Sequence, residues 1–277
     1  MKAADFHFLA ELVNRRSGMV LPADKLALAE SRLVPVARRF GFRDLEAMLA
    51  DLRHAPESLA SAAVEALAIH DTSFFRDRAV FEYFRAAILP PLLELRMRER
   101  QLRLWCAGAS TGQEPYSLAM LLADIDLSGC RVDLIATDLS EAAIAHGRDG
   151  VYSQAEVKRG LRPREIATHF IPEGGAWRIA ERVRRMVTFR VFNLLDDFGG
   201  LGEFDVIFCR NVLMYFDPRS KAAVLERLAG VLAPGGCLVL GASEAAPAAT
   251  DWLEPEDAAR GFYRKLTRRP RLKLLAG

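Results

Sequence analysis

Cysteine and histidine are scarce in this sequence, and long apolar runs are missing. The four cysteines stand far apart without a C-x-x-C pair, and the five histidines are scattered without metal-ligand spacing. We therefore expect no disulfide framework and no metal site, and buried reduced thiols of a cytoplasmic protein are the simpler interpretation. No apolar run approaches the roughly 18 residues of a membrane span, and the N-terminus has no signal-peptide pattern, so we expect no membrane insertion.

An excess of charge of one sign is also missing. Lysine and arginine number 38 against 36 aspartates and glutamates, a net charge of +2 that gives no reason to expect nucleic acid as a partner. Hydrophobic residues make up 51% and charged residues 27%, as in a soluble enzyme with a sizeable core. At 277 residues the chain exceeds the commonest domain size of about 100–150, so one large or two modest domains fit.

The third absence is the dinucleotide-binding fingerprint G-x-G-x-x-G. Residues 102–120, around which the chain is organised, contain an apolar run at 102–106, glycines at 108 and 112, and a helix start at Glu114-Pro115. Strand, glycine turn and helix open a nucleotide-binding α/β domain, and Gly108 lets the backbone approach a ligand closely. The two glycines are four residues apart, however, and do not fit the fingerprint.

Glu114 indicates a different ligand from NAD. A carboxylate at the start of this helix would repel a pyrophosphate and attract a cation. S-adenosylmethionine carries an ammonium and a sulfonium group and has no phosphate. The sequence therefore favours S-adenosylmethionine as the cofactor.

The first 90 residues show helical spacing of apolar residues and no β-rich run, so we expect a small helical bundle. The predicted helices are one that ends at Gly18, then 26–40 with a kink at Pro35, 45–52 and 58–69. A helix at 79–89, the pair Pro90-Pro91 and a charged helix to Arg100 follow. We divide the chain into a helical N-terminal domain, 1–78, and a second domain, 79–277.

From residue 102 strands and helices alternate, which predicts a parallel sheet with crossover helices. The predicted strands are 102–106, 132–137, 187–191, 204–209, 237–241 and 261–266, and the predicted helices are 115–124, 141–146 and 218–232. The alternation fails at about 150–190. A basic segment, a helix to His169, a turn at 172–175 and a hairpin strand at 177–183 indicate an insertion there.

Polar residues follow the predicted strands. Asp138, at the tip of the second strand, is placed to accept hydrogen bonds from a ribose. The same stretch could instead cap a helix. Because it follows the glycine loop in the chain, we favour ribose binding over capping. Asn193 follows the third strand, and Arg210, Asn211 and Tyr215 follow the fourth. The carboxyl ends of parallel strands face one crevice. Singly, Tyr215 could be a core aromatic and Arg210 a surface ion pair; together they favour a binding site.

Arg76 lies near the domain junction, after Phe74 and Phe75, which we expect to be packing residues. An exposed arginine is by default solvated. Beside an acceptor site, however, its planar guanidinium could bind a carboxylate through two hydrogen bonds.

Several of these stretches together resemble one family. T-S-F-F-R at 72–76, C-A-G-A-S-T-G-Q-E-P-Y-S at 106–117, T-D-L-S at 137–140, N-L at 193–194 and F-D-V-I-F-C-R-N-V-L-M-Y-F-D at 204–217 resemble the CheR type of bacterial chemotaxis receptor methyltransferases. The resemblance implies an α/β fold: a Rossmann-like S-adenosylmethionine-dependent methyltransferase domain with a small inserted β-subdomain, preceded by an all-α N-terminal domain. It also implies methyl transfer to glutamate side chains of chemoreceptor cytoplasmic domains, with S-adenosylhomocysteine as the other product.

The resemblance also implies residue roles. We expect ten residues in the donor pocket: His70, Thr72, Arg76, Gly108, Glu114, Asp138, Asn193, Leu194, Cys209 and Arg210. The family counterpart of Glu114 faces the methionine moiety and that of Asp138 the ribose. Arg76 and Tyr215 match residues close to the transferred methyl group, so we expect these two to be catalytic. The chain departs from the family at His70, where Asn is common, at Gln113, where Glu is usual, and at Ala242, where the family has His.

The reaction needs no general base. An acceptor glutamate has an ordinary pKa of about 4.3 and is already anionic at pH 7. The sulfonium and carboxylate charges cancel in the transition state, so catalysis should rest on in-line positioning, for which about 7–11 kcal/mol is available. We assign Arg76 to orienting the acceptor carboxylate and Tyr215 to shaping the methyl channel.

Two other functions stay open on the sequence alone. A methyltransferase of small molecules or of non-receptor substrates would share the donor pocket, but it gives no reason for the helical domain. Arg32, Arg38 and Arg39 of that domain could dock a glutamate-bearing receptor helix, or they could form a solvated basic face. A non-catalytic donor-binding scaffold is the second alternative, although such a protein need not keep Glu114 and Arg76.

The expected partners are the methylation helices of chemoreceptors, and we expect the enzyme to be a monomer. Some family members bind the receptor's C-terminal pentapeptide as an added edge strand, through a β-subdomain with a longer glycine-bearing loop. The turn between Phe170 and Trp177 is a few residues shorter here. We therefore expect a tether-independent enzyme; the alternative is that the turn differs without consequence.

Overall fold

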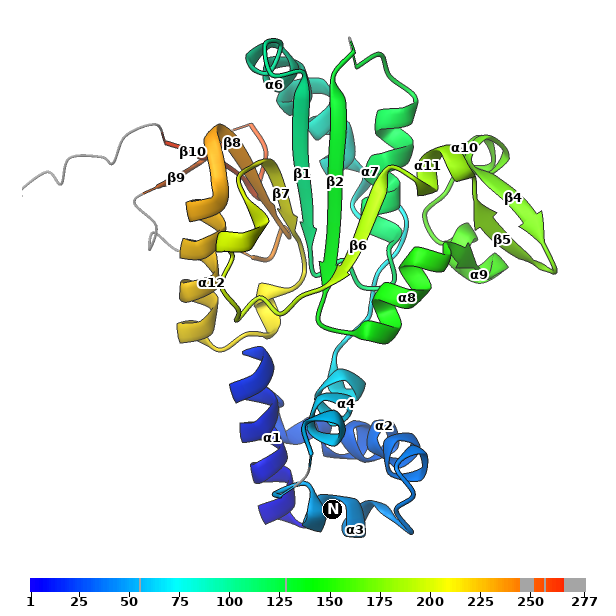
Figure 1. The fold of residues 1–277 in the computed structure, drawn as a ribbon, viewed down its shortest axis with the longest axis vertical. Helices are drawn as coiled ribbons and strands as arrows, with labels where there is room; N and C mark the ends of the chain where they lie inside the picture. Colours follow the sequence, from blue (N-terminus) through cyan, green and yellow to red (C-terminus); the bar gives the residue numbers. More distant parts are fainter. Residues whose placement is uncertain (55, 128, 245–251, 257, 267–277) are drawn as a thin grey trace, which may run out of the picture.

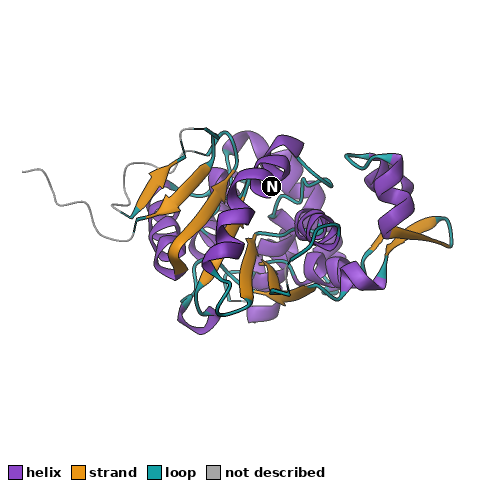
Figure 2. Cartoon of the chain, turned by 90° about the horizontal axis from the view of Figure 1, so that it is seen from above, coloured by secondary structure: helices purple, strands orange, loops and turns teal. Residues whose placement is uncertain are grey.

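The computed structural model describes residues 1–54, 56–127, 129–244, 252–256 and 258–266. A helical domain lies at the carboxyl ends of the central strands of a larger α/β domain, and a small β-sheet projects from the side of the larger domain (Figures 1 and 2). None of the helices in these described ranges is long and apolar enough to cross a membrane.

The N-terminal domain is helical, as predicted. Its elements are α1 (Ala3–Ser17), the 3-10 helix η1 (Ala23–Lys25), α2 (Leu26–Arg39), α3 (Leu45–Asp51) and α4 (Glu57–Leu67). Apolar side chains at helical spacing form one core, with Leu9, Leu33 and Ala63 fully buried. Pro35 lies inside α2, and the kink expected there stays a prediction. So does the boundary at residue 78; the described core of this domain extends to Leu67.

The segment between the domains corrects one prediction. Instead of two helices separated by Pro90-Pro91, α5 (Arg78–Tyr83) runs through a π-helical turn, η2 (Phe84–Ile88), into α6 (Leu89–Leu95). The prolines lie in the first turn of α6, where proline is well tolerated. The helix predicted to reach Arg100 ends at Leu95, and Arg96 instead pairs with Asp205 at 2.6 Å.

The α/β domain contains a seven-stranded sheet. Its strands are β1 (Gln101–Ala107), β2 (Arg131–Asp138), β6 (Val187–Val191), β7 (Phe204–Cys209), β8 (Leu232–Leu240), β9 (Leu253–Pro255) and β10 (Phe262–Lys265), in the order β6-β2-β1-β7-β8-β10-β9. The first five in that order are parallel, and β10 is antiparallel to its neighbours. The direction in which successive strands are added changes between β1 and β7. Open α/β sheets bind their ligands at such a switch point.

Both faces of the sheet are covered. In β1, Leu104 and Cys106 pack on the side of α7 (Gln113–Ala123) and α8 (Glu141–Asp149). Trp105 and Ala107 pack on the side of α12 (Pro218–Val231). This alternation is the two-residue period of a strand. The continuous apolar run at 104–107 is therefore what a strand buried on both faces requires.

The insertion predicted at about 150–190 is present as a β-subdomain. It comprises β3 (Val151–Tyr152), α9 (Gln154–Lys158), α10 (Pro163–His169), β4 (Phe170–Glu173), β5 (Ala176–Ile179) and α11 (Glu181–Arg184), with an antiparallel sheet in the order β3-β5-β4. The strand predicted at 177–183 is wrong beyond Ile179. The chain turns into α11 there, where Glu181 pairs with Arg184 and Arg185 one turn later.

Candidate active site

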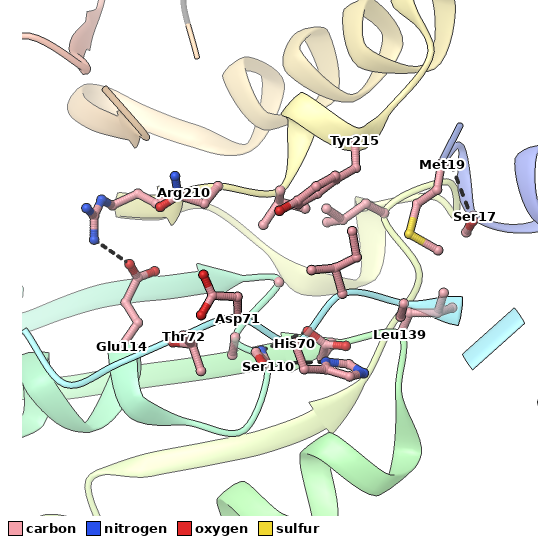
Figure 3. Close-up of a pocket in the computed structure, with 18 of the residues that line it drawn as sticks. Ser17, Met19, His70, Asp71, Thr72, Ser110, Glu114, Leu139, Arg210 and Tyr215 are labelled. Atoms are coloured by element: carbon pink, nitrogen blue, oxygen red, sulfur yellow. Dashed lines mark hydrogen bonds and ion pairs between the residues drawn. The ribbon is translucent and has the colours of Figure 1, made fainter. Parts of the chain in front are cut away.

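A pocket opens at the carboxyl ends of the parallel strands. It encloses about 890 Å³ of empty space, counting its mouth. Four of its lining residues, Gly108, Asp138, Asn193 and Arg210, follow or end β1, β2, β6 and β7. Arg210 and Glu114 lie at one end and Leu139 and Met19 at the other, with Tyr215 on the opposite side from Ser110 (Figure 3).

The glycine loop is shaped by close packing. Gly108 has a φ of +79°, and a Cβ there would lie 2.4 Å from Val212 Cγ2. The N–H groups of Gly108 and Ala109 both donate to the Thr137 carbonyl at 2.8 Å. The loop is therefore fixed to the end of β2, and an L side chain at 108 would displace the Val212 wall of the pocket.

Asp138 lines the pocket, and Ser140, two residues later, caps the helix α8. The Asp138 carboxylate accepts from the N–H of Ser110 at 2.8 Å and of Ser140 at 3.0 Å. The N-cap of α8 is Ser140, whose hydroxyl accepts from Ala143 N–H at 3.0 Å. A carboxylate has about four lone-pair positions, so Asp138 can accept further hydrogen bonds in the pocket.

The buried Arg210 forms ion pairs with Glu114, which is largely buried, and with Asp77, which is about half exposed. Arg210 donates from Nη1 to Glu114 at 2.9 Å and from Nη2 to Asp77 at 2.7 Å. Its Nε is buried and has no partner among the described residues. Burial raises the pKa of the Glu114 carboxyl above its ordinary value, with the charge of Arg210 opposing the rise.

The link between the domains brings His70, Thr72 and Arg76 to the pocket. Arg76 donates from Nη1 to the Asp71 carbonyl at 2.6 Å, and its Nη2 lies 3.7 Å from the Asp71 carboxylate. His70 Nδ1 lies 3.5 Å from Ser110 Oγ. The guanidinium of Arg76 is thus oriented by its own segment at the pocket edge.

Three further predicted residues lie at the ends of β6 and β7. Asn193 uses both ends of its amide within the protein, donating to the Arg16 carbonyl at 2.6 Å and accepting from Leu195 N–H at 3.0 Å. Leu194 lines the pocket. Cys209 is fully buried in the core on the α12 side, and burial raises the pKa of its thiol well above the ordinary value. Cys209 therefore faces the core, and the residue after it, Arg210, faces the pocket.

Tyr215 lies on a loop that a buried carboxylate holds. The short helix η4 (Leu213–Tyr215) follows Asn211, which has a φ of +58°. Glu244 accepts from the N–H groups of Asn211 at 2.6 Å, Met214 at 2.9 Å and Gly241 at 2.8 Å. Its carboxylate thereby joins the Tyr215 loop to the end of β8.

The helical domain supplies pocket residues that the sequence did not indicate. Ser17 and Met19, at the end of α1, line the pocket (Figure 3). Met19 forms an antiparallel bridge with Phe216, and Val20 N–H donates to the Tyr215 carbonyl at 2.8 Å. The only local signal was the helix end at Gly18, whose φ of +75° places the turn here.

The residues present fit a ligand with a cationic end and hydroxyl groups. Glu114 at one end of the pocket suits an ammonium, Asp138 suits a diol, and Leu139 and Leu194 provide apolar surface. S-adenosylmethionine has these groups. Within the described ranges no three His, Cys, Asp or Glu side chains are grouped to hold a metal ion.

Family models and curated relatives match most of this chain. Residues 4–68 match a family model described as CheR methyltransferase, all-alpha domain, and residues 70–262 match CheR methyltransferase, SAM binding domain. Chemotaxis protein methyltransferase 1 of Pseudomonas aeruginosa is 36% identical over 87% of this chain and 90% of its own length. The chemotaxis protein methyltransferase of Vibrio parahaemolyticus is 36% identical over 95% and 96%, and that of Escherichia coli is 34% identical over 87% and 85%.

Proposed function

Because the chain belongs to the CheR family of chemotaxis protein methyltransferases, we propose that the pocket between its two domains is the site of methyl transfer. The protein transfers methyl groups from S-adenosylmethionine to glutamate side chains of chemoreceptors. The observation that carries the assignment of the site is the convergence of Glu114, Asp138 and Arg210 on one pocket at the switch point of the sheet.

Residues at the carboxyl ends of several strands share the binding of the methyl donor. Glu114 is placed to bind the donor's ammonium group, and Asp138 to accept from the ribose hydroxyls. Gly108 permits close approach of the β1 loop. Arg210 holds Glu114 in place through the 2.9 Å ion pair. Cys209 supports the site from the core rather than by contact with the donor.

The acceptor side rests on Arg76 and Tyr215. Bound S-adenosylmethionine supplies a methyl group on a sulfonium, and the acceptor glutamate is anionic at neutral pH, so this chain has no proton to remove. Arg76 is placed to orient the acceptor carboxylate with its free N–H groups, and Tyr215 to wall the approach to the methyl group. Neither role requires a change of charge, which suits a reaction that depends on positioning.

We also propose that the enzyme works in the cytoplasm and finds its receptor without a peptide tether. All four cysteines are free thiols, which supports a reducing compartment. The β4–β5 connection is a two-residue turn, Gly174-Gly175, with both φ values positive. This is the tightest common hairpin turn, so no long loop projects beside the edge strand β4.

Calorimetry tests the donor site. S-adenosylmethionine and S-adenosylhomocysteine should bind the wild-type protein, and both affinities should fall strongly in Glu114→Ala and Asp138→Ala. Glu226, exposed on α12, provides the matched control Glu226→Ala, which should bind as the wild type does. Comparable affinity for NAD, or no binding of either donor form, would exclude this assignment of the pocket.

A further inference from the structure

An apolar groove lies beside the methyl-transfer pocket, between the helical domain and the Tyr215 loop. It encloses about 980 Å³, counting its open side. Four large hydrophobic residues that line it are 43–51% exposed: Val20, Leu28, Ile69 and Met214. A contiguous exposed apolar surface of this kind is typical of a protein-binding site rather than of a monomer's free surface.

The groove is continuous with the pocket. Met19, Ile69, Tyr215 and Phe216 line both of them. Tyr215 therefore lies between the two spaces, and its carbonyl accepts a hydrogen bond from the N–H of Val20, a residue that lines the groove. A chain lying in the groove would pass directly beside the place where the acceptor carboxylate must enter.

The charges of the groove are of one sign. Among the described residues that line it, the charged ones are Lys25 and Arg32. Arg32 donates from Nη1 to the Ala68 carbonyl at 2.7 Å, which fixes its guanidinium at the rim. Lys25 Nζ lies 3.4 Å from Asp24 and is half exposed. A partner that places apolar and acidic side chains together would complement this surface.

A second groove, which shares Arg32 and Ile69 with the first, is less suited to an acidic partner. It is lined by Arg32 and Arg39, but also by Glu65 and Asp71, and it reaches Ser140 near the Asp138 end of the pocket. Like charges there would oppose a glutamate-bearing chain. The apolar groove is therefore the better entry for the acceptor.

We propose that this apolar groove docks an amphipathic helix of the chemoreceptor, with its apolar stripe against Val20, Leu28 and Met214 and its acidic side chains near Lys25 and Arg32. The acceptor glutamate then enters at Tyr215. The proposal rests on the proposed function and adds the surface that recognises the protein substrate. Amphipathic helices present such an apolar stripe at positions i, i+3, i+4 and i+7, and a hydrophobic groove binds these side chains.

Leu28→Glu tests the groove, because Leu28 lies on α2, outside the donor pocket. The matched control is Leu95→Glu, a leucine of similar exposure at the end of α6, at the opposite end of the molecule (Figure 1). Initial rates of methyl-ester formation are measured against the concentration of purified chemoreceptor cytoplasmic domains, together with S-adenosylhomocysteine affinity by calorimetry. Leu28→Glu should raise the KM for the receptor at least tenfold while its affinity for S-adenosylhomocysteine stays within twofold, and Leu95→Glu should change neither.

Two further variants keep the test independent of folding defects. Leu28→Ala is compatible with an exposed helical position and should raise the KM several-fold. Lys25→Glu should also raise it, with a smaller effect at high salt because screening weakens surface charges. A receptor KM that is the same in Leu28→Glu, Leu28→Ala and Leu95→Glu would overturn the groove as the docking site. Failure of the wild-type protein to methylate any chemoreceptor domain would instead overturn the proposed function.

Discussion

Arg210 holds Glu114 through an ion pair of 2.9 Å in which the arginine side chain is almost completely buried. The same guanidinium binds Asp77, so two carboxylates share one cation. The group of three therefore carries a net charge of −1 when all are ionised. Arg210 and Glu114 are largely buried, whereas the Asp77 side chain is about half exposed. The excess of negative charge is complementary to a cationic ligand beside Glu114.

The pH dependence of donor binding should report Glu114. Because burial raises the pKa of this carboxyl, the free protein begins to protonate it at a higher pH than it would an exposed glutamate. The cationic donor binds the ionised form, so affinity should be full above the raised pKa and should fall as the pH drops through it. Glu114→Gln should lower the affinity roughly 10- to 150-fold near neutral pH, because the donor loses a hydrogen bond to a charged group. The same substitution should remove this pH dependence. Calorimetry over a pH series measures both; an unchanged pH profile in Glu114→Gln would exclude Glu114 as the titrating group.

Arg76 should affect turnover more than donor affinity. Its guanidinium is anchored by the Asp71 carbonyl at 2.6 Å and remains about one-third exposed at the pocket edge. Arg76→Ala should lower kcat on a chemoreceptor domain roughly 10- to 150-fold, as expected for a lost charged hydrogen bond to the acceptor, with a smaller rise in the donor dissociation constant. Arg76→Lys should recover only part of kcat, because lysine cannot bind a carboxylate in the same planar geometry. If Arg76→Ala abolished donor binding, Arg76 would be a structural part of the donor pocket.

Glu244 should act through the position of Tyr215. Glu244→Ala leaves the N–H groups of Asn211, Met214 and Gly241 without their partner, at a cost of about 1–3 kcal/mol for each that stays buried. We expect a lower melting temperature and a kcat that falls more than donor affinity does. Glu244→Gln keeps one acceptor oxygen and should recover part of kcat, and the neighbouring exposed Ser243→Ala is the matched control. A Glu244→Ala enzyme with lower stability but normal kcat would show that Tyr215 does not depend on this carboxylate.

Much of the site could be predicted because it follows from strand ends. Parallel strands bring residues such as Asp138 and Arg210 to one edge, so local patterns were sufficient to group them. Cys209 was predicted in the pocket through the family resemblance, but the two-residue period of β7 turns its side chain into the α12-side core. Met19 could not be predicted as a pocket residue from the sequence, because no local pattern around it indicates that the end of α1 contacts Phe216 of the other domain.

Peptide tethering should be absent. The turn Gly174-Gly175 joins Glu173 directly to Ala176 in register, so β4 has no adjoining loop to hold a peptide against its edge. Titration of the full-length protein with a chemoreceptor C-terminal pentapeptide should show no saturable binding in the micromolar range. A family member with the longer loop serves as the positive control. Micromolar binding that is lost on substitution of the exposed β4 residue Ile171 by proline would show that this β-subdomain does hold the peptide.

Glu65 should couple the helical domain to the donor site. This residue of α4 accepts from Ser140 Oγ at 2.6 Å and from Ala142 N–H at 2.8 Å, so one domain completes the helix cap of α8 in the other. Ser140 in turn donates its N–H to Asp138 at 3.0 Å. Glu65→Ala should lower the free energy of unfolding by about 1.5–3 kcal/mol and weaken donor binding several-fold, because the contact that positions Asp138 loses its support.

Glu57 provides the control for Glu65 on the same helix. It pairs with Arg16 within the helical domain, and both side chains are partly or largely exposed. Glu57→Ala should therefore have little effect on the free energy of unfolding and leave donor affinity unchanged. Urea unfolding followed by tryptophan fluorescence reports on the α/β domain, where Trp105 is buried and donates to Thr137 at 2.9 Å. If Glu65→Ala and Glu57→Ala behaved alike in both unfolding and donor binding, the capping contact would not connect the helical domain to the pocket. If only Glu65→Ala loses donor affinity, the helical domain contributes to donor binding as well as to recognition of the receptor.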